Sequence, residues 1–104
     1  MAASNIMFDS LTNQIVSKFK PDKVFLFGSQ ARGTATEKSD IDICVIMNTL
    51  DKRKTVCDLY YNIDIDIPID FLLYTPNEWD QCVYDKTSFA YLINAEGVEL
   101  FNGQ

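Results

Sequence analysis

The stretch FGSQARGTATEKSDIDI, residues 27–43, decides how the whole chain is interpreted. Gly28 and Ser29 form a small-residue turn at the end of an apolar run, and ten residues later a second apolar run begins with Asp40 and Asp42. Side chains alternate between the two faces of a β-strand, so both carboxylates are expected on one face. Carboxylates beside a turn whose backbone can approach phosphate indicate a site for a divalent metal and a nucleoside triphosphate.

Each of these two features is common when it occurs alone. A Gly-Ser pair is usually a plain turn, and an Asp-x-Asp pair is usually a solvent-facing strand edge. At ordinary residue frequencies, the two with this spacing arise by chance in a chain of this length with a probability on the order of 10⁻³. The joint pattern therefore favours the functional interpretation.

Composition limits the class of protein. The chain has 104 residues, so a single domain over residues 1–104 is expected. Its net charge of -6 argues against a nucleic-acid partner, because such partners are bound by broad basic surfaces. It has no histidine, and its three cysteines show no ligand spacing, which excludes imidazole catalysis and argues against zinc. We expect reduced cysteines, no signal or membrane-spanning segment, and a cytoplasmic location.

The hydrophobic pattern predicts an α/β domain with a small sheet. The expected elements, in chain order, are a helix capped by Ser4 and ended by Pro21, a strand over residues 24–27, a helical turn over 29–33, a polar loop over 34–39, a strand over 40–47, a helix over 51–62, a strand beginning near Ile69, a helix started by a Thr75–Glu78 capping box, a helix over 88–95, and a strand over 98–101.

A third carboxylate comes from residues 63–74, which alternate between apolar and other residues with period two. Pro68 cannot donate to a sheet ladder, so the paired strand is expected to begin just after it, with Asp70 inside. Neighbouring strands lie about 4.8 Å apart, so Asp70 can lie beside Asp40 and Asp42. Asp66 shares the same face of the alternation and stays open as the alternative.

Three carboxylates this close repel one another unless they share a cation. With oxygen ligands only, Mg²⁺ is the expected ion, and two ions about 3.5 to 4 Å apart could activate an attacking oxygen and stabilise a leaving one. Gly28 would let backbone N–H groups approach phosphate, and Ser29 would add a hydroxyl donor. Arg32 lies one helical turn further on and could reach either the triphosphate or only the surface.

These motifs resemble those of the nucleotidyltransferase superfamily that includes DNA polymerase beta, and most closely those of its minimal members. The matching residues are Gly28, Ser29, Asp40, Asp42 and Asp70, and the likeness extends over nearly the whole chain. The resemblance implies a mixed sheet flanked by helices, and transfer of AMP from ATP with two Mg²⁺ ions and release of pyrophosphate. It implies metal ligands at Asp40, Asp42 and Asp70, with Asp70 also helping to activate the acceptor hydroxyl. It places the β- and γ-phosphates at Gly28 and Ser29.

The resemblance also implies a partner. Minimal members often act beside a HEPN-domain protein, as the antitoxin that adenylylates a tyrosine of its toxin. We expect no extra domain here of the kind by which larger relatives bind other acceptors. Two alternatives stay open: a non-catalytic antitoxin that neutralises by contact, and adenylylation of a small molecule such as an aminoglycoside at a dimer interface. Aromatic residues could line that interface, although core packing is expected for most of them: Tyr60, Tyr61, Trp79 and Tyr84. Whether the protein forms homo- or hetero-oligomers is also left open.

Overall fold

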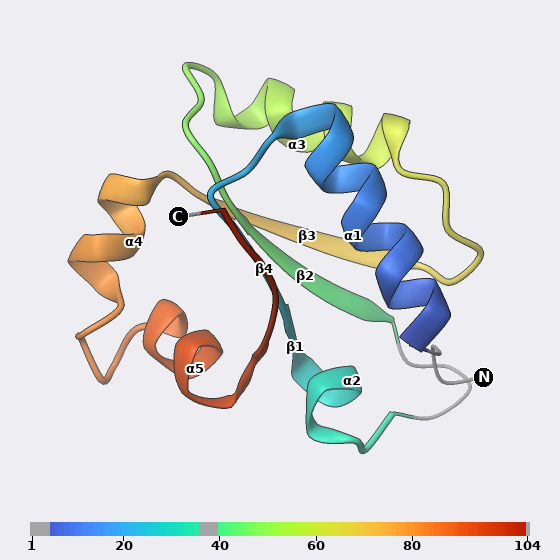
Figure 1. Ribbon diagram of the computed structural model, residues 1–104. Helices are drawn as coiled ribbons and strands as arrows, with labels where there is room; N and C mark the ends of the chain where they lie inside the picture. The colour runs from blue at the N-terminus through green and yellow to red at the C-terminus, as the bar shows by residue number, and fades with distance from the viewer. Residues whose placement is uncertain (1–4, 36–39, 104) are drawn as a thin grey trace.

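The computed structural model describes residues 5–35 and 40–103, and in these ranges it has the expected α/β architecture (Figure 1). The predicted helix cap at Ser4 and the loop residues 36–39 lie outside the described residues. No helix in the described ranges is long and apolar enough to cross a membrane. In chain order the elements are α1 (Asn5–Phe19), β1 (Lys23–Phe27), α2 (Gly28–Arg32), β2 (Ile41–Ile46), α3 (Lys52–Asn62), β3 (Ile69–Tyr74), α4 (Pro76–Cys82), α5 (Phe89–Glu96) and β4 (Val98–Asn102).

The strands form one sheet in the order β3-β2-β1-β4. β1 pairs antiparallel with β2 and β4, whereas β2 pairs parallel with β3, so the sheet is mixed as the resemblance implied. The parallel pair needs a crossover connection, which contains α3. Because β2 and β3 run in the same direction, both begin at the same end of the sheet, and β1 ends there.

Helices cover both faces of the sheet (Figure 1). On one face, α1 and α3 pack against the strands through residues such as Leu11 and Leu59. On the other face, α4 and α5 pack through Trp79 and Ile93. The central strand β2 is therefore buried on both sides along most of its length, and only Asp42, near its start, is half-buried.

The last two helices begin where the sequence predicted. Thr75 Oγ1 accepts a hydrogen bond from the Glu78 N–H at 3.2 Å, and Glu78 Oε1 accepts one from the Thr75 N–H at 2.9 Å, which completes the capping box of α4. Pro76 is the first residue of that helix, where no N–H is needed. The Ser88 hydroxyl accepts a hydrogen bond from the Tyr91 N–H and caps α5 in the same way.

The second strand is one residue shorter at each end than predicted, and at its start the reason is that its partner strand begins late. Ile41 pairs with Ile69, and the residue before Ile69 is Pro68, which has no N–H group for a ladder. The strand therefore starts at Ile41, and Asp40 lies one residue outside it and is exposed.

Candidate functional site

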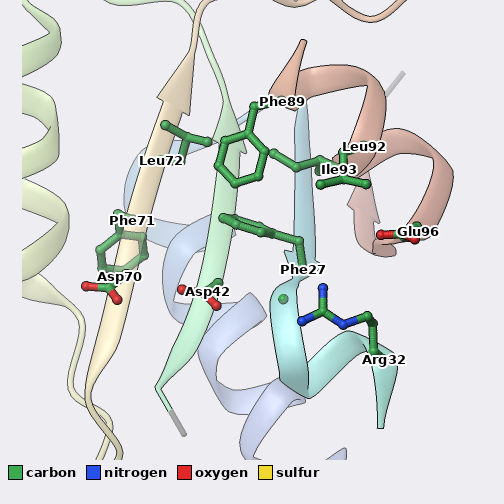
Figure 2. Close-up of a pocket in the computed structure, with 11 residues that line it drawn as sticks. Phe27, Arg32, Asp42, Asp70, Phe71, Leu72, Phe89, Leu92, Ile93 and Glu96 are labelled. Atoms are coloured by element: carbon green, nitrogen blue, oxygen red, sulfur yellow. The ribbon is translucent and has the colours of Figure 1, made fainter. Parts of the chain in front are cut away.

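A cavity of about 380 Å³ lies at the end of the sheet where β1 ends and β2 and β3 begin (Figure 2). Its volume is in the range of small-ligand pockets. Figure 2 shows Asp42, Asp70 and Arg32 toward one side of it and Phe89, Leu92 and Leu72 toward the other, with Glu96 further along α5. The lining residues are Phe27, Gly28, Arg32, Asp42, Asp70, Phe71, Leu72, Phe89, Leu92, Ile93 and Glu96.

Two of the predicted carboxylates meet in this cavity because of the register of the parallel strands. Asp42 and Asp70 are direct partners in the β2–β3 pairing, and such strands lie about 4.8 Å apart. Both residues line the cavity, and we call them the Asp42–Asp70 pair. On its other side Asp42 is paired with Phe27, the last residue of β1.

The surroundings of Asp42 oppose its ionisation. Its pKa is raised above the ordinary value of 3.8, first because partial burial penalises the charged carboxylate and then because the negative charges of Asp70 and Asp40 repel it. The positive charge of Arg32 acts in the opposite direction and lowers the pKa of Asp42. The raised pKa of Asp42 thus has local causes, partial burial of the carboxylate and its closeness to like charges.

Gly28 lies directly against the Asp42 carboxylate. Its φ of +75° is in the left-handed region, and a Cβ at this position would overlap Asp42 Oδ2 and lie 3.2 Å from Asp42 Cγ. Glycine is therefore required twice, for the backbone conformation and for the close approach. Gly33, which ends α2, has the same φ, but a Cβ there would meet no described atom within 4 Å.

The two other residues of the predicted phosphate-binding segment lie differently. Arg32 lines the cavity on its charged side, which favours the sequence interpretation in which it reaches the ligand (Figure 2). Ser29 is half-buried in α2 and is not among the residues that line the cavity. Its carbonyl oxygen accepts hydrogen bonds from the N–H groups of Gly33 and Thr34, which closes the turn after α2.

The remaining carboxylate candidates do not line the cavity. Asp40 is exposed just before β2, although its charge acts on Asp42. Asp66 is exposed in the segment before β3, so Pro68 does separate it from the paired strand as predicted. Within residues 5–35 and 40–103, no three Asp, Glu, Cys or His side chains form a group that could hold a metal ion. Of the three expected metal ligands, the structure brings together Asp42 and Asp70.

The Asp42–Asp70 pair fits a hard divalent cation. Carboxylate oxygens are the ligands that Mg²⁺ prefers, and this ion is commonly held by one or two carboxylates, with water and substrate phosphates completing its shell. A cation would also relieve the repulsion that raises the pKa of Asp42. The donor set and the electrostatics of the pair both match the predicted ion.

Sequence reasoning missed one wall of the cavity, which is formed by α5. Four of its residues line the cavity and recur at helical spacing: Phe89, Leu92, Ile93 and Glu96. Phe89 and Leu92 are 49% and 42% exposed, so both side chains are open to a ligand in the cavity. The spacing was visible in the sequence, but the packing of α5 beside β1 depends on contacts between distant parts of the chain.

The other aromatic residues divide between core and surface. Trp79 is 5% exposed and stacks on Phe25 with ring centroids 5.3 Å apart, so it lies in the core as expected. Tyr61 and Tyr84 are exposed, so the expectation of core packing is wrong for them. Tyr60 is partly exposed, and its hydroxyl accepts a hydrogen bond from the Phe71 N–H at the outer edge of β3.

An enzyme that transfers nucleotidyl groups needs carboxylates for a divalent cation beside a backbone turn that phosphate can approach, and this cavity has both. The fold and the site thus define a nucleotide-transferring enzyme. The chain belongs to the nucleotidyltransferase domain family, which it matches over residues 9–99.

Two proteins of Methanocaldococcus jannaschii, each named a putative protein adenylyltransferase, are similar to this chain. One is 33% identical over 90 residues, which cover 82% of this chain and 84% of that protein. The other is 44% identical over 52 residues, which cover 48% of this chain and 35% of that protein. The chain thus spans most of the first relative and about a third of the second.

Two solved structures have the same fold. A putative nucleotidyltransferase from Sulfolobus solfataricus has a TM-score of 0.58 and 18% identity, with 99% of this chain and 93% of that chain covered. A toxin–antitoxin crystal structure with AMP-PNP has a TM-score of 0.59 and 22% identity, with 93% of this chain and 74% of that chain covered. At these identities the likeness establishes the fold.

Proposed function

We propose that this chain is a Mg²⁺-dependent protein adenylyltransferase that moves AMP from ATP to a tyrosine hydroxyl of a HEPN-domain toxin and so acts as its antitoxin. The observation that carries the proposal is the in-register Asp42–Asp70 pair, with Gly28 against Asp42 in the same cavity. The acceptor class is supported by the names of the two Methanocaldococcus jannaschii relatives. The toxin–antitoxin structure with AMP-PNP supports a nucleotide donor and a toxin partner.

The charged side of the cavity would hold the donor. Asp42 and Asp70, with Asp40 beside them, would hold Mg²⁺, which when bound neutralises triphosphate charge and favours an ionised acceptor oxygen. Arg32 would pair with phosphate oxygens, since its guanidinium offers fixed donors to them. The turn at Gly28, together with Ser29, would hold the β- and γ-phosphates by close backbone approach.

The transfer is a single displacement. The acceptor hydroxyl oxygen forms a bond to the α-phosphorus, the bond from that phosphorus to the oxygen bridging to the β-phosphate breaks, and pyrophosphate leaves. The hydroxyl proton passes to the Asp70 carboxylate and then to water. The chain has no histidine, so a carboxylate is the available proton acceptor at this site.

The test follows the label from ATP. The purified chain is incubated with Mg²⁺ and the proteins encoded by its neighbouring genes, with ATP labelled either at the α- or at the γ-phosphate. We expect transfer of the α-label alone to one partner, and loss of that transfer with Asp42→Asn. Absence of α-label on every partner would contradict the proposal. Neutralisation of a toxin that survives Asp42→Asn would assign the chain to the non-catalytic alternative.

A further inference from the structure

The cavity extends well beyond its charged groups. Figure 2 shows Asp42, Asp70 and Arg32 along its lower side, and Phe89 and Leu92 above them. Cations and phosphates need only the charged side. A ligand that fills the rest of the cavity must therefore present an apolar portion toward α5.

The apolar side is a rigid surface that remains open. On α5, Ala90 and Ile93 are buried in the core and fix the helix, while Phe89 and Leu92 of the same helix are 49% and 42% exposed. Phe89 meets Phe27 edge-to-face, with ring centroids 5.4 Å apart and an interplanar angle of 86°. Because the Phe89 ring is already held in place, it loses little conformational entropy when a flat ligand stacks on it.

The open aromatic surface is tied to the carboxylates by strand register. Phe27, which holds Phe89, is the direct partner of Asp42 across the β1–β2 pair. Directly opposite side chains of antiparallel strands are about 5 Å apart. A ligand with its phosphates at Asp42 therefore carries its nucleoside within reach of Phe89.

We propose that the apolar side of the cavity, formed by Phe27, Leu72, Phe89, Leu92 and Ile93, binds the purine base of the donor nucleotide by stacking on Phe89. This inference rests on the proposed function, since it extends the same cavity from the phosphates to the base. None of these five side chains carries a hydrogen-bonding group, and Glu96, the other α5 residue that lines the cavity, has a carboxylate that can accept hydrogen bonds from N–H groups of either purine. The surface therefore selects for ring area and not between an amino and a keto substituent. Purine nucleotides then bind better than pyrimidine nucleotides, and ATP and GTP bind alike.

The experiment compares nucleotides with inorganic tripolyphosphate, which has the phosphates but no base. Each is titrated calorimetrically with Mg²⁺ into the wild-type chain, Phe89→Ala and Tyr84→Ala. Base stacking on one aromatic residue typically contributes about a tenfold gain in affinity, so we expect wild-type protein to bind ATP about tenfold more tightly than tripolyphosphate. GTP is expected within about threefold of ATP, with CTP weaker than both.

The variants separate the base from the phosphates. Phe89→Ala is expected to bind ATP no better than tripolyphosphate, with its affinity for tripolyphosphate unchanged. Tyr84→Ala, which removes an exposed ring outside the cavity, is expected to behave as wild type. Phe89→Trp keeps an aromatic face and is expected to keep the preference for ATP, which guards against a loss caused by misfolding.

Three results overturn the inference alone. The first is an unchanged ratio of ATP to tripolyphosphate affinity in Phe89→Ala. The second is CTP binding as tightly as ATP. The third is a Phe89→Ala chain that binds ATP normally but transfers AMP poorly, which would assign this surface to the acceptor and leave the proposed function standing. If wild-type protein binds neither ATP nor tripolyphosphate, the proposed function fails together with the inference.

Discussion

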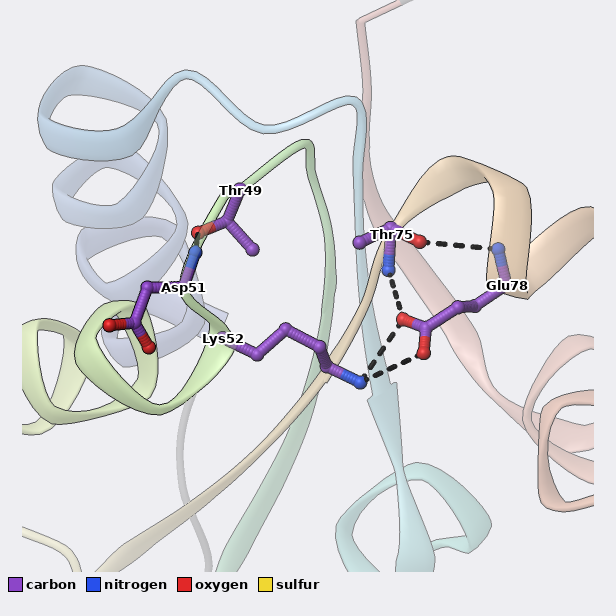
Figure 3. A network of polar contacts seen from close by, with 5 residues as sticks. All are labelled: Thr49, Asp51, Lys52, Thr75 and Glu78. Carbon is purple, nitrogen blue, oxygen red and sulfur yellow. Dashed lines mark hydrogen bonds and ion pairs between the residues drawn. The ribbon is translucent and has the colours of Figure 1, made fainter.

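The carboxylates at the two ends of the parallel β2–β3 pair have pKa values shifted in opposite directions. At the end where the strands begin, Asp42 is held beside Asp70, and its pKa is raised by burial and by neighbouring negative charge. Beyond the end where they finish, Glu78 accepts a hydrogen bond from the Thr75 N–H and pairs with Lys52 Nζ at 3.1 Å (Figure 3). The pKa of Glu78 is lowered, first by the Thr75 hydrogen bond and then by the one from Lys52.

The unfavourable electrostatics of this small fold are confined to one of these two ends. At the end beside Thr75 and Glu78, the Glu78 carboxylate caps the start of α4 and pairs with Lys52 of α3, so the local preferences agree with the fold. The end where β2 and β3 begin, which we call the cavity end, holds the Asp42–Asp70 pair, whose mutual repulsion the protein does not cancel. Conflicts of this kind are expected at functional sites and are removed elsewhere.

Replacing one carboxylate at each end should have the largest and most unequal effects. Asp42→Asn should lower AMP transfer by about 1,000-fold, because it removes a proposed metal ligand from a site that acts through charge. The same change should raise the free energy of unfolding of metal-free protein at neutral pH, because it removes a charge that is partly buried and lies against like charges. Label transfer and urea unfolding measure the two effects.

Glu78→Gln is the matched control at the other end. It should leave transfer within about twofold of wild type and lower the free energy of unfolding by about 0.5 kcal/mol, the scale of an exposed ion pair. In addition, Mg²⁺ at a concentration of about five times its Kd should raise the free energy of unfolding of wild-type protein and of Glu78→Gln by about 1 kcal/mol. It should leave the stability of Asp42→Asn unchanged. Loss of transfer in Glu78→Gln comparable to that in Asp42→Asn would contradict the division between the ends.

The second prediction concerns the two left-handed glycines of the cavity end. Gly28→Ala and Gly33→Ala should each cost about 1 kcal/mol of stability for the backbone conformation. Only Gly28→Ala also places a Cβ against the Asp42 carboxylate. It should therefore lower the free energy of unfolding by a further amount of about 1 kcal/mol and lower AMP transfer by about 100-fold. Thermal unfolding and label transfer, measured on both variants, separate strain from displacement of Asp42. Equal transfer by the two variants would show that the close contact has no role.

The sequence predicted local features better than contacts between distant segments. The capping box at Thr75 and Glu78 depends on neighbouring residues alone, and the structure confirms it. The start of β3 just after Pro68 was also readable, because proline lacks the ladder donor. The sequence allows Asp70 to lie beside Asp42 but does not determine it, since the crossover sets the register of two strands far apart in the chain.

What the sequence could not reveal was the shape of the cavity around these carboxylates. Asp40 belongs to the Asp-x-Asp motif, but it lies outside β2 and does not line the cavity, because the pairing of β2 with β3 starts one residue later. The wall from α5 was predicted only as a helix, since nothing in its own residues says which strand end it covers. Phe89 and Leu92 became candidates once tertiary packing placed them beside Asp42.

The third prediction uses the opposite pKa shifts of the two ends. Asp42 has a raised folded-state pKa, so the stability it contributes relative to Asp42→Asn is largest below 3.8 and is lost as the pH rises through the folded value. Glu78 has a lowered folded-state pKa, so its contribution relative to Glu78→Gln is present above 4.5 and is lost as the pH falls. Urea unfolding of metal-free wild type and both variants, between about pH 3.5 and pH 7, should give difference curves of opposite slope. Difference curves whose slopes have the same sign would contradict this assignment of the two pKa shifts.

The smallest expected effect tests whether the two ends are independent. Lys52 and Glu78 have side chains that are 45% and 44% exposed, so Lys52→Met should change the free energy of unfolding by no more than about 0.5 kcal/mol. From Asp70 to Thr75 the chain advances five residues, or about 16 Å of strand, which is twice the screening length of about 8 Å at physiological salt. Charge at Lys52 should therefore not reach the cavity, and Lys52→Met should keep its transfer rate within about twofold at both low and physiological salt. A larger change that disappears at high salt would mean that the ends are coupled electrostatically. A larger change that persists would mean that α4 and α3 hold β2 and β3 in the register that brings Asp42 and Asp70 together.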